Sequence, residues 1–279
     1  RESDASLDER HLSMLRLYAD FVGRLLERTV NDQRQALERQ EQVRRVIDEG
    51  LFHVVYQPIV RIDSREVVGH EALTRFTAEP RRTPDQWFAQ AALAGMTVDL
   101  EGAVVRKALE DFHRLPPQTY LSLNVSPQAI VEGSVLGALQ ANPPSRLVLE
   151  VTEHASIDDY QALDSQLAPL RAQGLQLAVD DAGAGYASFR HILKLKPDII
   201  KLDGSLVGAI DKDPGIRALA AALARFARET GAAVLADAIK LKGGSVEAGL
   251  RFYLGGDAVT EDGGYVAKVL TEKARLDQV

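Results

Sequence analysis

RLVLEVTEHASIDDYQALDSQLAPLRAQGLQLAVDD, residues 146–181, contains two short apolar runs separated by an amphipathic segment. The runs RLVLEVTE and LQLAVDD have the length and the apolar character of buried strands. Residues 160–173, between them, have the apolar spacing of an amphipathic helix. A strand, a helix and a strand in this order predict two parallel strands joined by a crossover.

The same alternation runs along the chain after residue 50, with further helices predicted at residues 98–115 and 215–230. An open doubly wound sheet and a closed barrel both suit this order of elements. The open sheet usually carries a glycine-rich phosphate turn after its first strand, and this chain has none. About 230 residues is also a common size for a β/α barrel, so we expect a barrel. The runs that predict its strands are FHVVYQPIV, EVVGHEALTRF, YLSLNVS, RLVLEVTE, LQLAVDD, DIIKLD and AAVLADAI.

The first two predicted strands are joined differently from the others. Only RIDSRE separates them, and this is too short to hold a crossover helix. We therefore expect an antiparallel hairpin at the start of the barrel, which makes the barrel irregular.

Residues 1–49 have another pattern. From Leu12 to Ile47, seam positions recur at alternating three- and four-residue steps, the period of a two-helix seam. This predicts one long helix, and polar Gln33 and Gln40 in the seam suit a linker helix that pairs weakly. A solvated helix that only packs on the next domain is the alternative. We expect a linker helix at 1–49 and a barrel domain at 50–279. The seam consists of Leu12, Leu15, Ala19, Val22, Leu26, Thr29, Gln33, Ala36, Gln40, Val43 and Ile47.

Composition excludes several classes of function. The 279 residues are 46% hydrophobic and 26% charged, as in ordinary globular proteins. A net charge of -7 argues against binding a DNA or RNA duplex, which requires a basic face. No cysteine is present and no apolar run has membrane-spanning length. We expect a cytoplasmic segment without membrane contact, and a start at Arg1 suggests a piece of a longer protein.

Polar residues end most of the predicted strands. The active site of a β/α barrel is built at the carboxyl ends of its strands, where the loops converge. Each residue alone could have a purely structural role, such as capping a helix, forming an ion pair with an arginine or stabilising a turn. Together, carboxylates without a cation would repel one another, and hard oxygen donors suit Mg²⁺ or Mn²⁺ better than zinc. The oxygen donors among these residues therefore predict a metal site at the barrel mouth. The polar residues at the strand ends are Glu71, Asn124, Glu150, Asp180, Asp181, Lys201, Asp203 and Asp237.

Several short motifs resemble one known family. GHEALTRF at residues 69–76 carries the Glu-Ala-Leu signature of the EAL domains, phosphodiesterases of the bacterial second messenger cyclic di-GMP. YQPIV, LNVS, LEVTE, VDDAGAG and PDIIKLD match in the family's order between residues 51 and 203. The resemblance implies an irregular TIM-like (β/α)8 barrel with one antiparallel strand, preceded here by the long N-terminal helix.

The resemblance also implies an activity, the hydrolysis of cyclic di-GMP to linear pGpG with two cations, Mg²⁺ or Mn²⁺. Lys201 would orient the attacking water, and Glu153 would brace the loop after the paired aspartates. Gln57, Leu73 and Arg75 would contact the dinucleotide. Glu71, Asn124, Glu150 and Asp180 would hold one cation, and Asp181 would hold the second.

The C-terminal third departs from the family pattern. ADAIK at residues 236–240 stands where the family has Ala-Glu-Gly-Val-Glu, so Asp237 replaces a catalytic glutamate and Lys240 replaces a second glutamate. Aspartate is one methylene shorter, enough to misplace a group in a site that needs about 0.5 Å accuracy. The family's Gln-Gly-Tyr appears as GGY, with Gly263 in place of glutamine, and KLKGGSVEAG predicts a divergent or inserted loop.

Three functions remain open on the sequence. The intact ligand residues favour a working phosphodiesterase, whereas Asp237, Lys240 and Gly263 support a degenerate receptor that binds cyclic di-GMP without cutting it. An interaction module that has lost the ligand is the third. LSMLRLYADFVGRLLER, residues 12–28, resembles the exit helix of a GAF-type sensor domain. We therefore expect the output half of a signalling protein, with an upstream sensor domain, acting as a homodimer.

Overall fold

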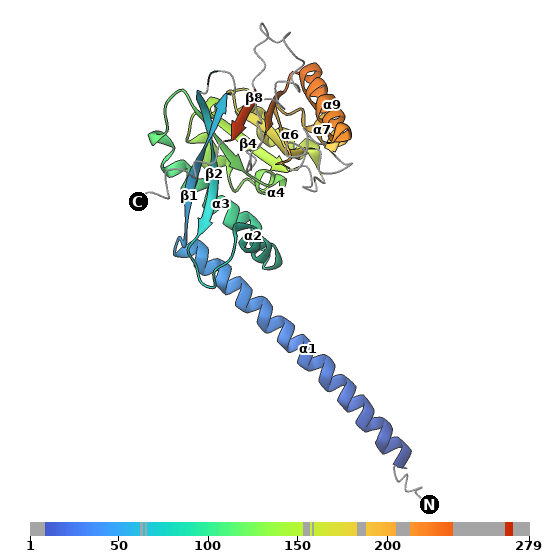
Figure 1. The fold of residues 1–279 in the computed structure, drawn as a ribbon. Helices are drawn as coiled ribbons and strands as arrows, with labels where there is room; N and C mark the ends of the chain where they lie inside the picture. The colour runs from blue at the N-terminus through green and yellow to red at the C-terminus, as the bar shows by residue number, and fades with distance from the viewer. Residues whose placement is uncertain are drawn as a thin grey trace, which may run out of the picture.

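A closed barrel of eight strands, β1 to β8 in chain order, forms the body of the protein. The computed structural model describes residues 9–61, 64, 66–152, 157, 159–182, 188–204, 213–236 and 266–269. β1 is antiparallel to both its neighbours, β2 and β8, and the other neighbouring strands are parallel. Helices lie outside the barrel and α1 extends far from it (Figure 1). The predicted irregular (β/α)8 barrel with a long N-terminal helix is confirmed.

Strands and helices alternate as the sequence predicted, except that the last strand was not recognised. The strands are β1 (Phe52–Arg61), β2 (Val67–Phe76), β3 (Tyr120–Asn124), β4 (Leu147–Thr152), β5 (Gln176–Ala182), β6 (Ile199–Leu202), β7 (Ala233–Ala236) and β8 (Val266–Val269). The helices are α1 (Glu9–Asp48), α2 (Pro84–Leu93), α3 (Thr97–Glu110), α4 (Pro127–Val131), α5 (Leu136–Gln140), α6 (Tyr160–Arg171), α7 (Ser188–Leu195) and α9 (Pro214–Thr230), with short 3₁₀ helices at Phe112–Arg114 and Pro144–Arg146.

The unit β4–α6–β5 shows why these residues form a crossover. β4 and β5 are buried along most of their length, as expected for parallel strands covered on both faces. Asp159 caps α6, because its Oδ1 accepts hydrogen bonds from the backbone N–H groups of Gln161 and Ala162, both at 2.9 Å. α6 then packs on the barrel through one stripe of leucines, Leu163, Leu167 and Leu170.

The predicted hairpin between β1 and β2 is also confirmed. Its two strands pair antiparallel, with Gln57 opposite Glu71, and the backbone N–H of Arg61 bonds the carbonyl of Glu66 at 2.9 Å where the hairpin turns. Because β1 runs against the other strands, it joins β2 to β8 and closes the barrel without a crossover helix.

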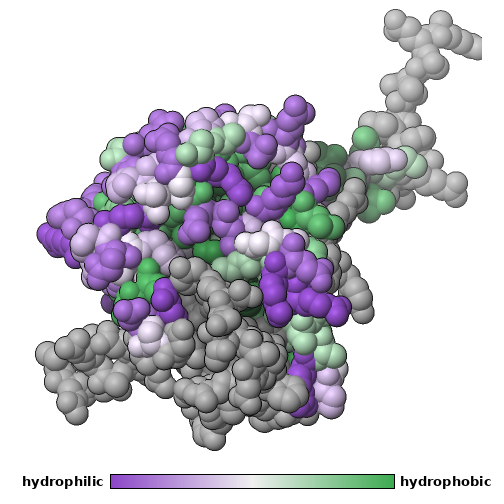
Figure 2. All heavy atoms as spheres, turned by 90° about the horizontal axis from the view of Figure 1, so that it is seen from above, coloured by the Kyte–Doolittle hydropathy of each residue, from purple (hydrophilic) through white to green (hydrophobic). Residues whose placement is uncertain are grey.

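Two apolar clusters hold the helices against the barrel. The larger lies between the barrel and its outer helices. A separate cluster joins the last turns of α1 to α2, α3 and the end of β2, with Val43 and Val46 fully buried in it. The described face seen from above is mainly hydrophilic, with hydrophobic patches between polar groups (Figure 2). No helix in the described part of the chain has both the length and the hydrophobicity needed to cross a membrane.

Gly69 gives a test of packing inside the barrel. A Cβ at Gly69 would lie 2.5 Å from the ring of Tyr120 on the neighbouring strand. We expect Gly69→Ala to lower the free energy of unfolding by about 1–3 kcal/mol, because the partly buried ring must move. Urea denaturation measures this loss. As a control, Gly137→Ala should cost nothing, since no atom lies within 4 Å of its new Cβ; equal losses would contradict the packing argument.

Candidate active site

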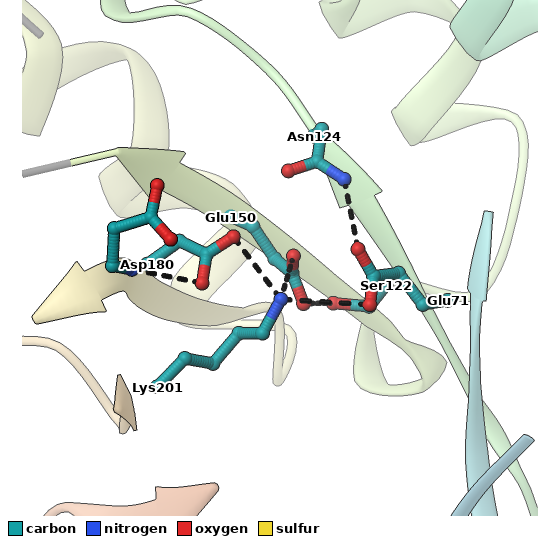
Figure 3. A network of polar contacts seen from close by, with 7 residues as sticks. Glu71, Ser122, Asn124, Glu150, Asp180 and Lys201 are labelled. Atoms are coloured by element: carbon teal, nitrogen blue, oxygen red, sulfur yellow. Dashed lines mark hydrogen bonds and ion pairs between the residues drawn. The ribbon is translucent and has the colours of Figure 1, made fainter. Parts of the chain in front are cut away.

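Polar side chains from five neighbouring strands meet at one end of the barrel (Figure 3). They stand at the carboxyl ends of parallel strands or on β2 beside them, and register brings them level: Asn124 lies opposite Glu150, and Glu71 opposite Ser122. Several are almost completely buried, although they are charged. The residues are Glu71 on β2, Ser122 and Asn124 on β3, Glu150 on β4, Asp180 on β5 and Lys201 on β6.

Lys201 lies at the centre of this cluster and is 1% exposed. Its Nζ donates to Glu150 Oε2 at 2.7 Å and to Asp180 Oδ2 at 3.1 Å, and it lies 3.5 Å from Glu71 Oε2. One ammonium group therefore faces three carboxylates, which are brought together by three different strands.

Each carboxylate uses its second oxygen for a local donor. Ser122 Oγ donates to Glu150 Oε1 at 2.6 Å, Asn124 Nδ2 donates to Glu71 Oε1 at 3.1 Å, and the backbone N–H of Asp181 donates to Asp180 Oδ1 at 2.9 Å. Both oxygens of all three carboxylates thus have a positively polarised partner, which is what burial of charge requires.

The charges shift the protonation of the most buried carboxylate. The pKa of Glu150 is raised to about 7, chiefly by burial. Lys201 lowers this pKa, and the negative charges of Glu71 and Asp180 raise it. A carboxyl group with this pKa holds or releases a proton near neutral pH, as a group that takes part in acid–base chemistry must.

The paired aspartates diverge because of the backbone between them. Asp181 has φ 58°, in the left-handed region, and the pairing of β5 with β6 is irregular between Val179 and Ala182. Bulges of this kind redirect side chains at active sites. The two carboxylates therefore leave the chain in different directions, and that of Asp180 accepts a hydrogen bond from Lys201.

The residues predicted to bind substrate lie on the hairpin. Gln57 pairs with Glu71 across β1 and β2, and Leu73 and Arg75 follow Glu71 at steps of two along β2. Side chains at this spacing share one face of a strand. Arg75 is exposed, and its Nη1 donates to the carbonyl of Thr74 at 2.9 Å.

Some predicted residues stand outside the described part of the chain, and one described residue was missed. Glu153, Asp237, Lys240 and Gly263 belong to the former. Ser122 was missed, although a signal existed: it lies two residues before Asn124 in an apolar strand, and a period of two places both on one face.

The described residues contain no group of three acidic or histidine side chains arranged as a metal centre. Instead, the three carboxylates converge on the Lys201 ammonium. The chemistry of the donors still fits Mg²⁺ or Mn²⁺, because they are carboxylate and amide oxygens gathered at one barrel end.

Fold and site define a class of protein, a β/α barrel with acidic residues gathered around the carboxyl ends of its parallel strands. The chain belongs to the EAL domain family, whose sequence model matches residues 40–242.

The chain is similar to curated bacterial proteins. Uncharacterized protein Rv1357c of Mycobacterium tuberculosis is 32% identical over 186 residues, which are 61% of this chain and 60% of the relative. Probable cyclic di-GMP phosphodiesterase PdeD of Escherichia coli is 30% identical over 173 residues, 58% of this chain and 32% of the relative. The matches thus span less than two thirds of these relatives' length.

Solved structures share the fold. The structure described as PaMucR Phosphodiesterase, c-di-GMP complex, has a TM-score of 0.68 and 22% identity, covering 83% of this chain and 94% of that one. A manganese/cy-diGMP complex of Klebsiella pneumoniae BlrP1 has a TM-score of 0.62 and 24% identity, covering 78% of this chain and 54% of that one.

The pKa of Glu150 makes stability depend on pH. Folded Glu150 titrates at about 7 and the unfolded residue near its ordinary 4.5, so the folded state binds the proton more tightly. In a buffer that contains a metal chelator, the free energy of unfolding should therefore fall by at most about 3 kcal/mol as the pH rises from about 4.5 to 7. Urea denaturation across this range measures the slope. Glu150→Gln should remove this contribution, and an unchanged slope would show that other groups cause it.

Ser122 should hold Glu150 in its ionised form. Ser122→Ala removes the donor to Glu150 Oε1, so we expect a loss of about 1–3 kcal/mol at about pH 8 and a smaller loss at about pH 5, where Glu150 is protonated. Ser134→Ala is the matched control, because Ser134 Oγ donates to the uncharged Ala129 carbonyl at 3.2 Å. A loss at Ser122 that does not change with pH would contradict this role.

Proposed function

We propose that the barrel hydrolyses cyclic di-GMP to linear pGpG with bound Mg²⁺ or Mn²⁺. The observation that carries the proposal is the convergence of Glu71, Asn124, Glu150, Asp180 and Lys201 at the carboxyl end of the strands. Membership of the EAL domain family supports it, as do relatives named as probable cyclic di-GMP phosphodiesterases.

In the proposed reaction, the oxygen of a water molecule bonds to a phosphorus of the ring. The bond from that phosphorus to a ribose 3′ oxygen breaks, and the leaving oxygen receives a proton, so that the opened product keeps a 5′ phosphate. Divalent cations, when bound, neutralise the phosphodiester and lower the pKa of the water.

The residues of this chain would divide the work. Glu71, Asn124, Glu150 and Asp180 would hold one cation and Asp181 the second. Lys201 would donate a hydrogen bond to the attacking water and fix its direction. The dinucleotide would contact Gln57, Leu73 and Arg75 on the hairpin, while Glu153 braces the loop after the aspartates and Asp237 stands in the place of a catalytic glutamate.

A receptor that binds cyclic di-GMP without cutting it is the second candidate. The substitutions Asp237, Lys240 and Gly263 favour it, because they alter the part of the family pattern that supports catalysis. The residues around Lys201 favour the enzyme, since losing one supporting group usually slows a reaction without abolishing it.

The proposal has a cellular setting. Residues 1–49 would serve as a linker helix and residues 50–279 as the output domain of a bacterial signalling protein. The protein would act in the cytoplasm as a homodimer, with an upstream sensor domain and no nucleic-acid duplex or membrane as partner.

Hydrolysis is tested by incubating the chain with cyclic di-GMP and Mg²⁺ or Mn²⁺ and separating pGpG by chromatography. We expect turnover that stops in a chelator and falls at least about 100-fold in Glu71→Ala, because this carboxylate lies in the cluster. Glu132→Ala, which changes an exposed carboxylate elsewhere, is the control. Tight binding of cyclic di-GMP without turnover would contradict the enzyme and support the receptor function. No binding would contradict both candidates.

Asp237→Glu tests the weak point of the site. Restoring the longer side chain should raise turnover several-fold if the shortened carboxylate limits the reaction, since about 0.5 Å matters in such sites. Turnover is compared at saturating substrate with Asp164→Glu as a surface control. Equal turnover in the wild type and in Asp237→Glu would show that Asp237 does not limit the reaction and would point to Gly263 instead.

A further inference from the structure

The long helix α1 carries a surface that the barrel does not cover. Figure 1 shows the helix leaving the barrel as an arm, and only its last turns touch the domain. Between Met14 and Glu38, Gly23 is half-buried and all other residues are exposed. Ten of the fourteen exposed large hydrophobic residues in the described part of the chain lie on this arm. They are Met14, Leu15, Leu17, Tyr18, Phe21, Val22, Leu25, Leu26, Val30 and Leu37.

These side chains gather on one side of the helix. The opposite side, at helical spacing, carries Arg16, Asp20, Arg24, Glu27, Asn31, Arg34 and Glu38. Of the ten hydrophobic residues, Leu17 lies at the edge of this polar side, seven residues before Arg24. The apolar side continues at steps of three and four into Val43 and Ile47, which pack against α2 and α3. The apolar face of α1 is therefore buried in the last turns of the helix and exposed to solvent along the arm.

The exposed area is too large for an isolated helix. The ten side chains are 48–66% exposed, or roughly 100 Å² each, which gives about 1,000 Å² where a stable interface needs about 800 Å² per partner. The largest apolar patch on an ordinary monomer is about 300–600 Å². Helices also gain most of their stability from packing an apolar face, and the arm packs against nothing in the described part of this chain.

A second copy of the arm fits this face in one orientation. A parallel pair in register places each seam residue opposite its own copy, and the seam from Leu15 to Gln40 contains no charged residue. Gln33 and Gln40 would then meet their own copies, where two amides can hydrogen-bond. In an antiparallel pair overlapping along the whole arm, these glutamines would face the apolar N-terminal half and lose that partner.

We propose that residues 14–40 of α1 form a parallel, in-register pair with the same segment of a second copy of this chain. The pairing ends before Val43, because that side chain is fully buried in the cluster with α2 and α3. Both barrels of the dimer then lie at the same end of the paired helices. The surface is independent of hydrolysis, so a failure of the proposed enzyme activity leaves it standing.

Disulfide formation tests the orientation, and the absence of native cysteine gives a clean background. Leu15→Cys and Leu26→Cys, prepared separately, should each form a disulfide with their own copy on mild oxidation. The two positions are about 16 Å apart along the helix, and a disulfide needs Cα atoms within about 7 Å. An antiparallel pair can satisfy only one of them. Asn31→Cys on the polar side is the control and should stay unlinked.

Sedimentation equilibrium tests the pairing itself. The wild-type chain should have twice its mass of 30.5 kDa, and the double change Val22→Glu with Leu26→Glu should reduce it to a single copy with an unchanged near-ultraviolet spectrum. Arg24→Glu with Glu27→Lys, on the polar side, should remain paired. A wild-type monomer, a mass of four copies, or a disulfide between Leu15→Cys and Leu26→Cys copies would each overturn the proposal.

Discussion

The contact of Lys201 with three carboxylates is the constraint on which the end of the barrel depends. A closed barrel brings β2, β4 and β5 around one interior, and all three carry an acidic residue there. Burying one unpaired charge costs several kcal/mol. The ammonium meets one oxygen of each carboxylate, and Ser122, Asn124 and the Asp181 backbone meet the others. The strands can therefore remain buried while carrying a polar site.

The same arrangement explains why this cluster is suited to a divalent cation. The carboxylates are already ordered by their local donors, so a cation would not have to gather them from solvent. Compensation by one ammonium also leaves the cluster rich in negative charge, and this excess adds to burial in holding the pKa of Glu150 at about 7. A bound divalent cation is the simplest second positive group that would balance this excess of negative charge.

Much of this could be predicted from the sequence, because apolar runs and their spacing are local signals. β1 to β7 and the hairpin followed from the apolar runs and from the six residues of RIDSRE. β8, VAKV, was not predicted, although β6 and β7 are equally short. Strand ends indicated Glu71, Asn124, Glu150, Asp180 and Lys201. Ser122 and the central place of Lys201 were not predicted, since both depend on which oxygen faces which donor across neighbouring strands, and this is not a local property.

The arm and the site are joined by one continuous set of contacts. Past the proposed pairing segment, Arg45 donates to the carbonyl of Glu79 at 3.2 Å and Gln42 accepts from Arg82 at 3.1 Å, so α1 holds the loop that follows β2. Phe76, the last residue of β2, packs in the same cluster as Val43 and Val46. β1 follows α1 directly, and its first residue, Phe52, packs in this cluster too. Because β2 also carries Glu71 and Arg75, a change in the register of the paired helices would act on the hairpin of β1 and β2 before it reached the other strands of the barrel. The apolar face of α1 thus serves two purposes: along the arm it would pair with a second copy, and at its C-terminal end it attaches the helix to the barrel domain. The second part begins close to the end of β2, the strand that carries the EAL signature.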